Sequence, residues 1–568
     1  MMTSRDAIHP LRRRREGGGR EEKLTFMEDF GLYQICLLAA TQISYMPIAA
    51  SILSTSFLKM SEGACALVLE AKNSSASGGT NGTNRYRTGT VPSDEFYSLF
   101  SLWDLDCTEN ADIQTAITTT VMAGGLVGAF ISGFVADRYG RKPVMTASLA
   151  LCSLSNAALL LSSYLSWLLA LPLFLVLGAS CGGYMTTNLV LVVESLCLPS
   201  SRLLVVALNG WSLSMAGTAL LAFMCPHWFQ YHLSVSIISL ICAVCLFFIA
   251  DESLRWLKSS RKVTRFDRAS SRLIRFNRGE NFKDIPLLCQ LEKDASAAAP
   301  VRPLAARESD ESGQQAVSPA SALSYFDLFR ERSLRPRLFS LAYCFFSSSV
   351  VSFGFYFAID SLSGSRYANM AAAGCGKFVF GLIPFVFSSC ASRKQVALIS
   401  VAVTAIAAWV VLACLLAGLP LQSMAIMVLS ILATAALDPN WKISHLYSTE
   451  LFPTNMRNMA RGFCNSLARV GSVLAPLLSH FRHNGPHVYI GIFAVLLTAQ
   501  FAITALFLPN QVHGRSTVPP SSLQDALPAV PSEEDRKRKA KRSEYEEEED
   551  ARSREDSSQL SETAPLTP

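Results

Sequence analysis

Charged residues are scarce in this chain of 568 residues: 17% are Asp, Glu, Lys or Arg, whereas about a quarter is usual for soluble proteins. They crowd into residues 1–28, 251–338 and 511–568, which leaves long apolar tracts between these segments. A soluble chain of this length would divide into several domains with charged surfaces. The scarcity and the uneven distribution exclude an ordinary soluble protein and indicate a polytopic membrane protein.

Other features that the sequence lacks exclude further classes of function. The chain has no P-loop, which argues against transport driven directly by ATP. It has no His, Cys and Asp cluster with catalytic or metal-binding spacing, so we expect neither an enzyme nor a metal or cofactor. No cleavable signal peptide is evident, because the first apolar run is too long and lacks a small-residue cleavage site. The net charge of +6 is attributed to basic loops, so nucleic acid is not an expected partner.

Twelve apolar segments are each close to the ~20 residues that cross a bilayer as a helix. They predict an all-α polytopic membrane protein with twelve transmembrane helices, arranged as six plus six. The first bundle covers residues 29–250 and the second covers residues 337–510. The predicted spans are residues 31–57, 112–134, 144–163, 166–193, 203–224, 232–250, 337–359, 367–390, 395–416, 421–446, 459–479 and 486–508.

Basic residues alternate between the connections. The short connections at 162–166, 225–232 and 418–423 contain no Lys or Arg, whereas the connections between them are basic. By the positive-inside rule, both termini are predicted to be cytoplasmic, together with the central loop 251–336. The residues outside the bundles are therefore a basic cytoplasmic N-terminus (1–28) and a tail, residues 511–568. The tail has alternating charge blocks and is predicted to be disordered, with possible cytoplasmic partners.

Residues 58–111 then form the one large extracellular loop. This loop carries two glycosylation sequons, at Asn73 and Asn81. It also contains Cys65 and Cys107, which predict one disulfide if the loop is extracellular.

The stretch GFVADRYGRKPV ends the second apolar run with charge and glycine. Arg141 and Lys142 alone would serve as a positive-inside anchor. An anchor does not explain the spacing of Gly133, Asp137 and Gly140. Gly133 permits close approach of a neighbouring backbone, and Gly140 permits a tight turn. Asp137 is placed to pair with basic groups.

This stretch resembles the loop signature of the major facilitator superfamily. Four further segments resemble solute carrier family 22, the transporters of organic cations, organic anions and carnitine, and the resemblance covers residues 29–510. These segments are SLWDLDC (101–107), DESLRWL (251–257), SYFDLFRERSLRPR (324–337) and YSTELFPTNMRN (447–458).

The resemblance implies two six-helix halves, a substrate site at mid-membrane and alternating access by rocking. It also implies that ion pairs at the cytoplasmic end hold the outward-facing state and break at low cost. The residues predicted to form this gate are Gly133, Asp137, Arg138, Gly140, Arg141, Glu194 and Arg202 in the first half, with Glu450 and Arg457 in the second.

Charges inside spans are costly and therefore point to the substrate site. Three basic residues are candidates: Lys377, Lys442 and Arg469. Arg469 lies where anion and carnitine members of the family resemble this chain. Lys442 lies one turn from Asp438, and the alternative for this pair is that the two charges only neutralise each other. Lys377 could instead be structural or extend towards the interface.

Aromatic residues in the spans are candidates for an apolar lining of this site, Tyr356 among them. The others are Tyr45, Phe353 and Trp441, and plain packing is the alternative for each. Interior cations favour a substrate that carries a carboxylate, because a guanidinium binds a carboxylate bidentately.

The chain departs from the family pattern at several positions and so reads as a divergent, orphan-like member. The second-half copy of the loop signature is reduced to ASRK (391–394), and Asp251 replaces a proline. Two hypotheses follow. The first is a plasma-membrane carrier of small organic ions, namely anions or zwitterions such as carnitine-like compounds, that works as a uniporter or exchanger. The alternative is a transport-inactive, transporter-shaped receptor or regulatory protein.

Overall fold

The structure is a computed structural model that describes most of residues 30–510. The predicted sequons at Asn73 and Asn81, the predicted disulfide of Cys65 with Cys107 and the whole tail 511–568 lie outside the described residues. The described residues are 30–59, 96–103, 105, 111–197, 199–260, 262–277, 329, 332, 334–388, 390–452, 457–479 and 485–510.

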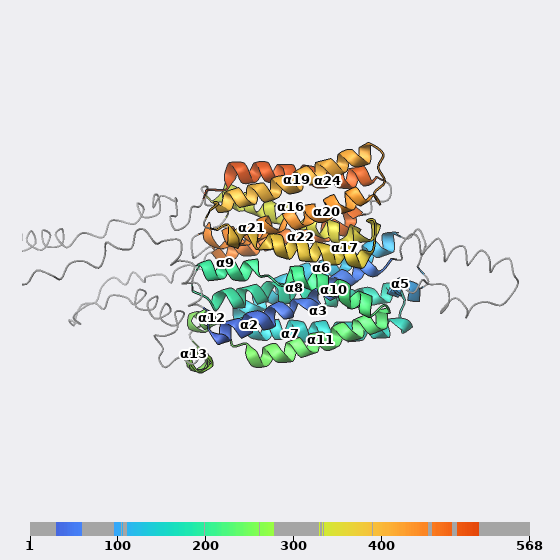
Figure 1. The fold of residues 1–568 in the computed structure, drawn as a ribbon. Coiled ribbons are helices and arrows are strands. Elements are labelled where there is room, and N and C mark those ends of the chain that lie inside the picture. The colour runs from blue at the N-terminus through green and yellow to red at the C-terminus, as the bar shows by residue number, and fades with distance from the viewer. Residues whose placement is uncertain are drawn as a thin grey trace, which may run out of the picture. The chain divides into compact units, whose positions relative to one another are not determined.

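The described helices run side by side in two groups that follow the chain order (Figure 1). The first half consists of α2 (Leu32–Ile43), α3 (Tyr45–Leu53), η2 (Ser54–Phe57), α5 (Leu99–Leu102), α6 (Ala111–Tyr139), α7 (Arg141–Leu159), η3 (Leu160–Tyr164), α8 (Trp167–Glu194), α9 (Pro199–Ala207), α10 (Trp211–Met224) and α11 (Trp228–Ile249).

Two short helices, α12 (Leu254–Ser259) and α13 (Val263–Phe276), follow the first half. The second half consists of α16 (Arg335–Ala358), η5 (Ile359–Ser361), α17 (Arg366–Gly381), α18 (Ile383–Val386), α19 (Arg393–Leu416), α20 (Met424–Ala436), α21 (Asp438–Glu450), α22 (Arg457–Ser479) and α24 (Pro486–Phe507).

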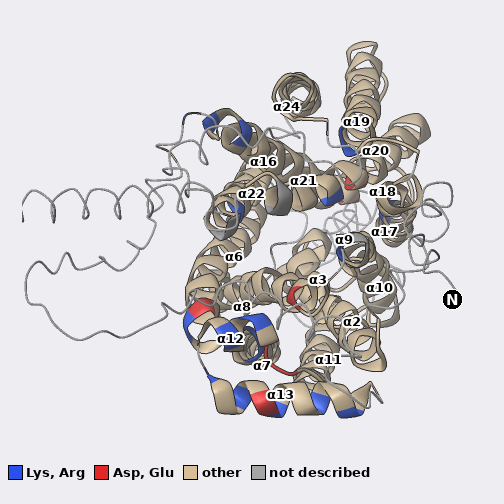
Figure 2. Cartoon of the chain, turned by 90° about the vertical axis from the view of Figure 1, so that its left-hand side faces the viewer, with Lys and Arg blue, Asp and Glu red and all other residues tan. Residues whose placement is uncertain are grey.

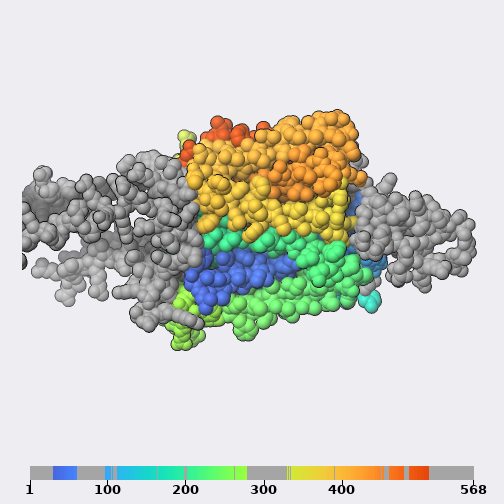
Figure 3. Space-filling view, viewed as in Figure 1, coloured from blue at the N-terminus to red at the C-terminus, as the bar shows by residue number. Residues whose placement is uncertain are grey.

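Viewed along the helices, each half groups on its own side (Figure 2). In the space-filling view the two halves meet without a visible groove on the face shown (Figure 3). We call the end of the bundle that holds Gly140 and Asp251 the inner end, since it is predicted to be cytoplasmic, and the opposite end the outer end. Large apolar side chains such as Phe130, Ile399 and Leu506 are exposed on the helices, as expected where lipid is the solvent.

Eleven helices of the described chain are long and apolar enough to cross a membrane, and all eleven coincide with predicted spans. The largest shift is at the second span, which continues to Tyr139 where 134 was predicted. The remaining predicted span, the eleventh in chain order at 459–479, is α22. This helix is less apolar than the others because it carries Arg457, Arg461 and Arg469, and it contacts both α16 of its own half and α6 of the first half.

Four spans are interrupted, which the apolar pattern did not predict. The first breaks at Ser44, ahead of Pro47, and the tenth breaks at Leu437, ahead of Pro439. Proline lacks an N–H and so cannot complete the helical hydrogen-bond ladder. The eighth breaks at Leu382, between α17 and α18. The fifth breaks between α9 and α10, at residues 208–210. There the backbone N–H of Gly210 donates a hydrogen bond of 2.6 Å to the side chain of Gln42, which lies just ahead of the break in the first span.

Glycines allow α6 and α8 to lie in direct backbone contact. A Cβ atom on Gly124 or Gly128 would collide with the α8 backbone, and one on Gly178 or Gly182 would collide with the α6 backbone. Each pair has the four-residue spacing that brings membrane helices together. The prediction that Gly133 serves this purpose is wrong, because no described atom lies within 4 Å of a Cβ placed there. The close approach occurs earlier along α6, at Gly124 and Gly128.

Candidate functional site

The turn between α6 and α7 is formed by Gly140, whose φ of 116° favours glycine. A side chain at this position would collide with the carboxylate of Glu252. That carboxylate accepts hydrogen bonds from the backbone N–H groups of Arg141, at 2.7 Å, and Lys142, at 3.3 Å. Glu252 therefore satisfies the free donors at the start of α7, where a negative charge also suits the helix dipole.

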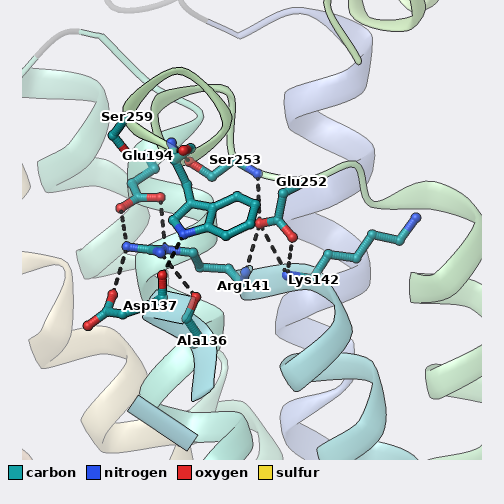
Figure 4. A network of polar contacts seen from close by, with 9 residues as sticks. Ala136, Asp137, Arg141, Lys142, Glu194, Glu252, Ser253 and Ser259 are labelled. Carbon is teal, nitrogen blue, oxygen red and sulfur yellow. Dashed lines mark hydrogen bonds and ion pairs between the residues drawn. The ribbon is translucent and has the colours of Figure 1, made fainter. Parts of the chain in front are cut away.

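The Arg141 side chain joins three helix ends at the inner end of the first half (Figure 4). Its guanidinium lies 3.1 Å from the Asp137 carboxylate and 3.4 Å from the Glu194 carboxylate. It also donates a hydrogen bond of 3.1 Å to the carbonyl oxygen of Ala136. Arg141 is itself buried, whereas Asp137 is exposed. The structure thus brings together three predicted gate residues, all from the first half.

Two other gate candidates with described side chains, Arg138 and Arg202, do not contact Arg141. Arg138 is exposed beside the ring of Tyr139, and Arg202 donates hydrogen bonds to the carbonyl oxygen of Leu196. Glu450 ends α21 and Arg457 begins α22, and the side chains of both lie outside what the structure describes. Their role as a second-half gate stays a prediction.

Glu252 and Trp256 belong to the same network, although they were not among the predicted gate residues. The Trp256 indole donates a hydrogen bond of 2.8 Å to the carbonyl oxygen of Asp137. Burial raises the pKa of Glu252, and the backbone N–H groups around it oppose that shift. Both residues belong to DESLRWL, one of the segments that resemble solute carrier family 22. That resemblance could therefore have drawn attention to them.

The reduced second-half motif is stabilised in a different way. At the start of α19, Ser392 and Gln395 form a capping box, in which the Gln395 side chain accepts a hydrogen bond of 2.9 Å from the Ser392 backbone N–H. Lys394 donates a hydrogen bond of 2.7 Å to the carbonyl oxygen of Ala505 on α24. Neutral groups therefore cap this helix where an acid caps α7.

The interior of the second half holds three charges in one cluster. The ammonium of Lys377, on α17, lies 3.5 Å from one carboxylate oxygen of Asp438, and the ammonium of Lys442 lies 3.6 Å from the other. All three side chains are at most 5% exposed. Asp438 thus pairs with Lys442, as the neutralisation alternative expected, but it also pairs with Lys377. The cluster keeps one positive charge in excess.

Tyr356 links this cluster to the first half. Its ring lies 5.5 Å from the Lys377 ammonium, and its hydroxyl accepts a hydrogen bond of 3.4 Å from the indole of Trp211 on α10. The backbone carbonyl of Tyr356 accepts a hydrogen bond from Ser56. An aromatic face near an ammonium stabilises the positive charge. Tyr356 is therefore part of the interface between the halves.

Two arginines on α22 face the first half. The Arg469 guanidinium donates a hydrogen bond of 3.7 Å to the sulfur of Met185 on α8, which is a weak acceptor. Arg461 lies nearer the inner end, within electrostatic reach of Glu194 and Tyr45, and its buried Nε atom has no hydrogen-bond partner in the described chain. Arginine presents five donors, so both guanidinium groups retain donors for a ligand.

Two other buried side chains nearby are also unsatisfied. Asn188, on α8, is fully buried beside Tyr45, yet neither its amide oxygen nor its amide nitrogen makes a hydrogen bond of normal geometry with a described residue. The Nδ1 atom of His445, on α21, has no partner among those residues either. Buried polar groups without partners are rare and mark places where a ligand or water completes the structure. Sequence reasoning missed Arg461, Asn188 and His445.

Contacts between the halves close the outer end. The rings of Phe57 and Tyr367 stack at 5.6 Å, and Arg366 donates a hydrogen bond of 2.7 Å to the carbonyl oxygen of Lys59. The ring of Phe223 also contacts the Tyr367 ring, edge-on at 5.9 Å. These contacts join the two halves at the outer end.

Comparison with known proteins supports this architecture. The family model described as Major Facilitator Superfamily matches residues 102–391, which is more than half of the chain. The chain belongs to the Major Facilitator Superfamily. The structure of the proton:xylose symporter XylE bound to 6-bromo-6-deoxy-D-glucose is similar, with a TM-score of 0.58 over 84% of this chain and 96% of that one. At 13% identity, this likeness concerns the fold alone.

Named relatives indicate to which branch of this superfamily the chain is similar. Human organic anion transporter 3 is 26% identical over 433 residues, which cover 73% of this chain and 72% of the relative. Solute carrier family 22 member 6 of Mus musculus is 26% identical over 74% of this chain and 71% of its own length. Solute carrier family 22 member 1 of Bos taurus is 27% identical over 67% and 62%, respectively. These relatives support membership of solute carrier family 22, and the chain is a multi-pass membrane transporter, not an enzyme.

Proposed function

We propose that this transporter moves small organic anions across the plasma membrane by alternating access, as a uniporter or exchanger. Zwitterions that carry a carboxylate, such as carnitine-like compounds, belong to the same proposal. Both termini are proposed to be cytoplasmic, which places the inner end of the bundle in the cytosol. The basic connections at that end support this orientation.

The observation that carries the proposal is the charge balance at the centre of the bundle. Three cations lie there, namely Lys377, Lys442 and Arg469, and Asp438 is shared by the two lysines. Arg461 lies nearer the inner end, within electrostatic reach of Glu194. Uncompensated positive charge inside a membrane is costly. A bound anion would relieve that cost, whereas a purely cationic substrate would increase it.

The arrangement also suggests how the substrate is held. Arg469 presents free donors towards the first half, and Asn188 contributes an unpaired buried amide on the facing helix. A carboxylate between these helices would satisfy groups from both halves at once. Since its binding joins α22 to α8, it favours the conformation in which the halves are closed around it. The relatives named as organic anion transporters support the same substrate class.

Uptake of labelled organic anions into cells that express the protein at their surface tests the proposal. Arg469→Ala should reduce uptake about tenfold to a hundredfold, which corresponds to the loss of ~1.5–3 kcal/mol from a hydrogen bond to a charged group. Arg469→Lys should retain part of the uptake because it keeps the charge but not the bidentate geometry. Val470→Ala, on the exposed face of the same helix, is the matched control and should transport normally.

The test panel should contain monocarboxylates, dicarboxylates and zwitterions with a quaternary ammonium, together with purely cationic compounds. Uptake of the cations alone would contradict the proposed substrate class. No uptake of any compound despite surface expression would favour the alternative, a transporter-shaped receptor or regulatory protein.

A further inference from the structure

Helix α13 has an arginine-rich side that transport does not require. Arg265, Arg268, Arg272 and Arg275 recur at intervals of three, four and three residues, which places them in one stripe along the helix. All four are exposed. The one acidic residue of the helix, Asp267, falls outside this stripe.

The adjoining side of α13 attaches the helix to the first half. Leu273 is buried, and Phe266 and Phe276 pack against the same core. Asn277, which ends the helix, accepts a hydrogen bond of 2.9 Å from the backbone N–H of Tyr33 and donates one of 3.1 Å to the side chain of Gln34. The helix is therefore fixed to the inner end of α2, and its arginine stripe has a defined direction.

The arginine stripe of α13 lies next to the inner end of α11, where the membrane boundary is expected. Arg272 lies 2.9 Å from the Asp251 carboxylate and donates a hydrogen bond to the carbonyl oxygen of Phe248, at the end of the α11 span. In Figure 1 α13 is seen end-on while the spans cross the view, and in Figure 2 it lies along one edge of the bundle with several basic residues. The helix thus runs perpendicular to the spans, along the edge of the bundle at its inner end, where lipid headgroups are expected.

Lipid chains would find an apolar surface next to the stripe. Phe247 and Phe248, at the end of α11, are 58% and 64% exposed. The ammonium of Lys142, on α7, lies 5.2 Å from the Phe247 ring and adds a further cation at this boundary. Within the described chain, no ion pair or hydrogen bond is found for the side chains of Arg265, Arg268 or Arg275. Free cations beside exposed aromatic rings match the headgroup and acyl chain of one amphiphile.

We infer that α13 is a binding site for anionic phospholipids of the cytoplasmic leaflet, such as phosphatidylserine. Arginine forks bind phosphate oxygens well, and basic segments at that surface gain about 1 kcal/mol for each Lys or Arg. The orientation rests on the proposed cytoplasmic inner end, but the binding itself does not depend on transport. An amphipathic, basic helix in the plane of the membrane has the form that such binding requires.

The test measures binding of fluorescent phosphatidylserine, and of phosphatidylcholine with the same acyl chains, to the purified full-length protein in detergent. The wild type should prefer phosphatidylserine, and added salt should weaken this preference. Replacing Arg265, Arg268 and Arg275 together by Gln should weaken phosphatidylserine binding by about a hundredfold, at about fivefold for each arginine. The corresponding triple Lys variant should retain it.

Controls on the same helix keep the test decisive. Val263→Gln alters an exposed position outside the stripe and should leave binding unchanged. Asp267→Asn removes the one acid and should tighten binding, which can be measured even if the triple Gln variant does not fold. Equal binding of both lipids to the wild type, or an unchanged affinity in the Gln and Asn variants, would overturn the inference. Equally tight binding of glycerophosphoserine, which has no acyl chains, would assign the site to a soluble anion instead.

Discussion

The Glu252 carboxylate lies 2.7 Å from the backbone nitrogen of Arg141 and caps α7 from a segment 111 residues further along the chain. The same carboxylate accepts a hydrogen bond from the Ser253 backbone N–H. One acid therefore ties the segment after α11 to the turn between α6 and α7. The charged loop of the first half is thus held by a partner outside it.

Glu252→Ala should destabilise the protein by about 0.5–2 kcal/mol, the usual cost of losing a helix N-cap. The Arg141 and Lys142 N–H groups would then lack their acceptor. Thermal unfolding of the purified variant in detergent measures the effect. Glu252→Gln keeps an acceptor oxygen of the same length and should lose less stability, and a Gln variant as unstable as the Ala variant would contradict a capping role.

The pH dependence of this site has a definite sign. Burial raises the pKa of Glu252 above its usual value, so the folded state holds the proton at a pH where the unfolded chain has released it. The corresponding stability is present at low pH and is lost as the pH rises through the folded-state pKa. Relative to Glu252→Gln, the wild type should therefore gain thermal stability as the pH is lowered from neutrality. A wild type that instead loses stability relative to the Gln variant over this range would show that the charged form is favoured.

The packing of α6 on α8 predicts different outcomes for two glycines in the same helix. Gly128→Ala should greatly reduce the folded fraction, because its methyl group would collide with the backbone at Ala179. Gly133→Ala should fold like the wild type, because no described atom lies within 4 Å of the new methyl group. Size-exclusion chromatography of fluorescent fusions compares the two. Normal folding of Gly128→Ala would mean that the helices can separate without cost.

The positions of the spans were predictable because about 20 apolar residues in succession have few alternatives to a membrane helix. Their breaks were harder to predict, although Pro47, Pro439 and Gly210 carry the signal. Proline and glycine are tolerated in membrane helices where neighbouring groups satisfy the backbone. Whether a given helix breaks therefore depends on a partner such as Gln42, which lies far away in the sequence.

The candidate site was only partly predictable for the same reason. The pair of Asp438 with Lys442 follows from their spacing on one helix. The pair of Asp438 with Lys377 does not, because 61 residues separate them and only the packing of α17 on α21 brings them together. Arg461 looked like one more basic residue near a cytoplasmic connection, and the unpaired amide of Asn188 appears only once its neighbours are known.

The shared carboxylate of Asp438 predicts a compensating pair of substitutions. Asp438→Asn leaves two buried ammonium groups without their counter-ion and should destabilise the protein by about 3–5 kcal/mol. Adding Lys442→Met removes one of these charges while keeping an apolar side chain of similar length. The double variant should therefore unfold at a higher temperature than Asp438→Asn alone. If the second substitution lowers stability further, Lys442 has a role beyond its pair with Asp438.

The closed outer end predicts that linking its two sides arrests transport. Phe57 and Tyr367 belong to different halves, and their rings stack at 5.6 Å. Alternating access requires these residues to separate once in each cycle. In a protein with Phe57→Cys and Tyr367→Cys, a short bifunctional thiol reagent should abolish uptake, and cleavage of the link should restore it. The single variants are the controls and should be unaffected by the same reagent. Undiminished uptake after complete crosslinking would show that this contact persists through the cycle, in which case substrate would have to pass elsewhere.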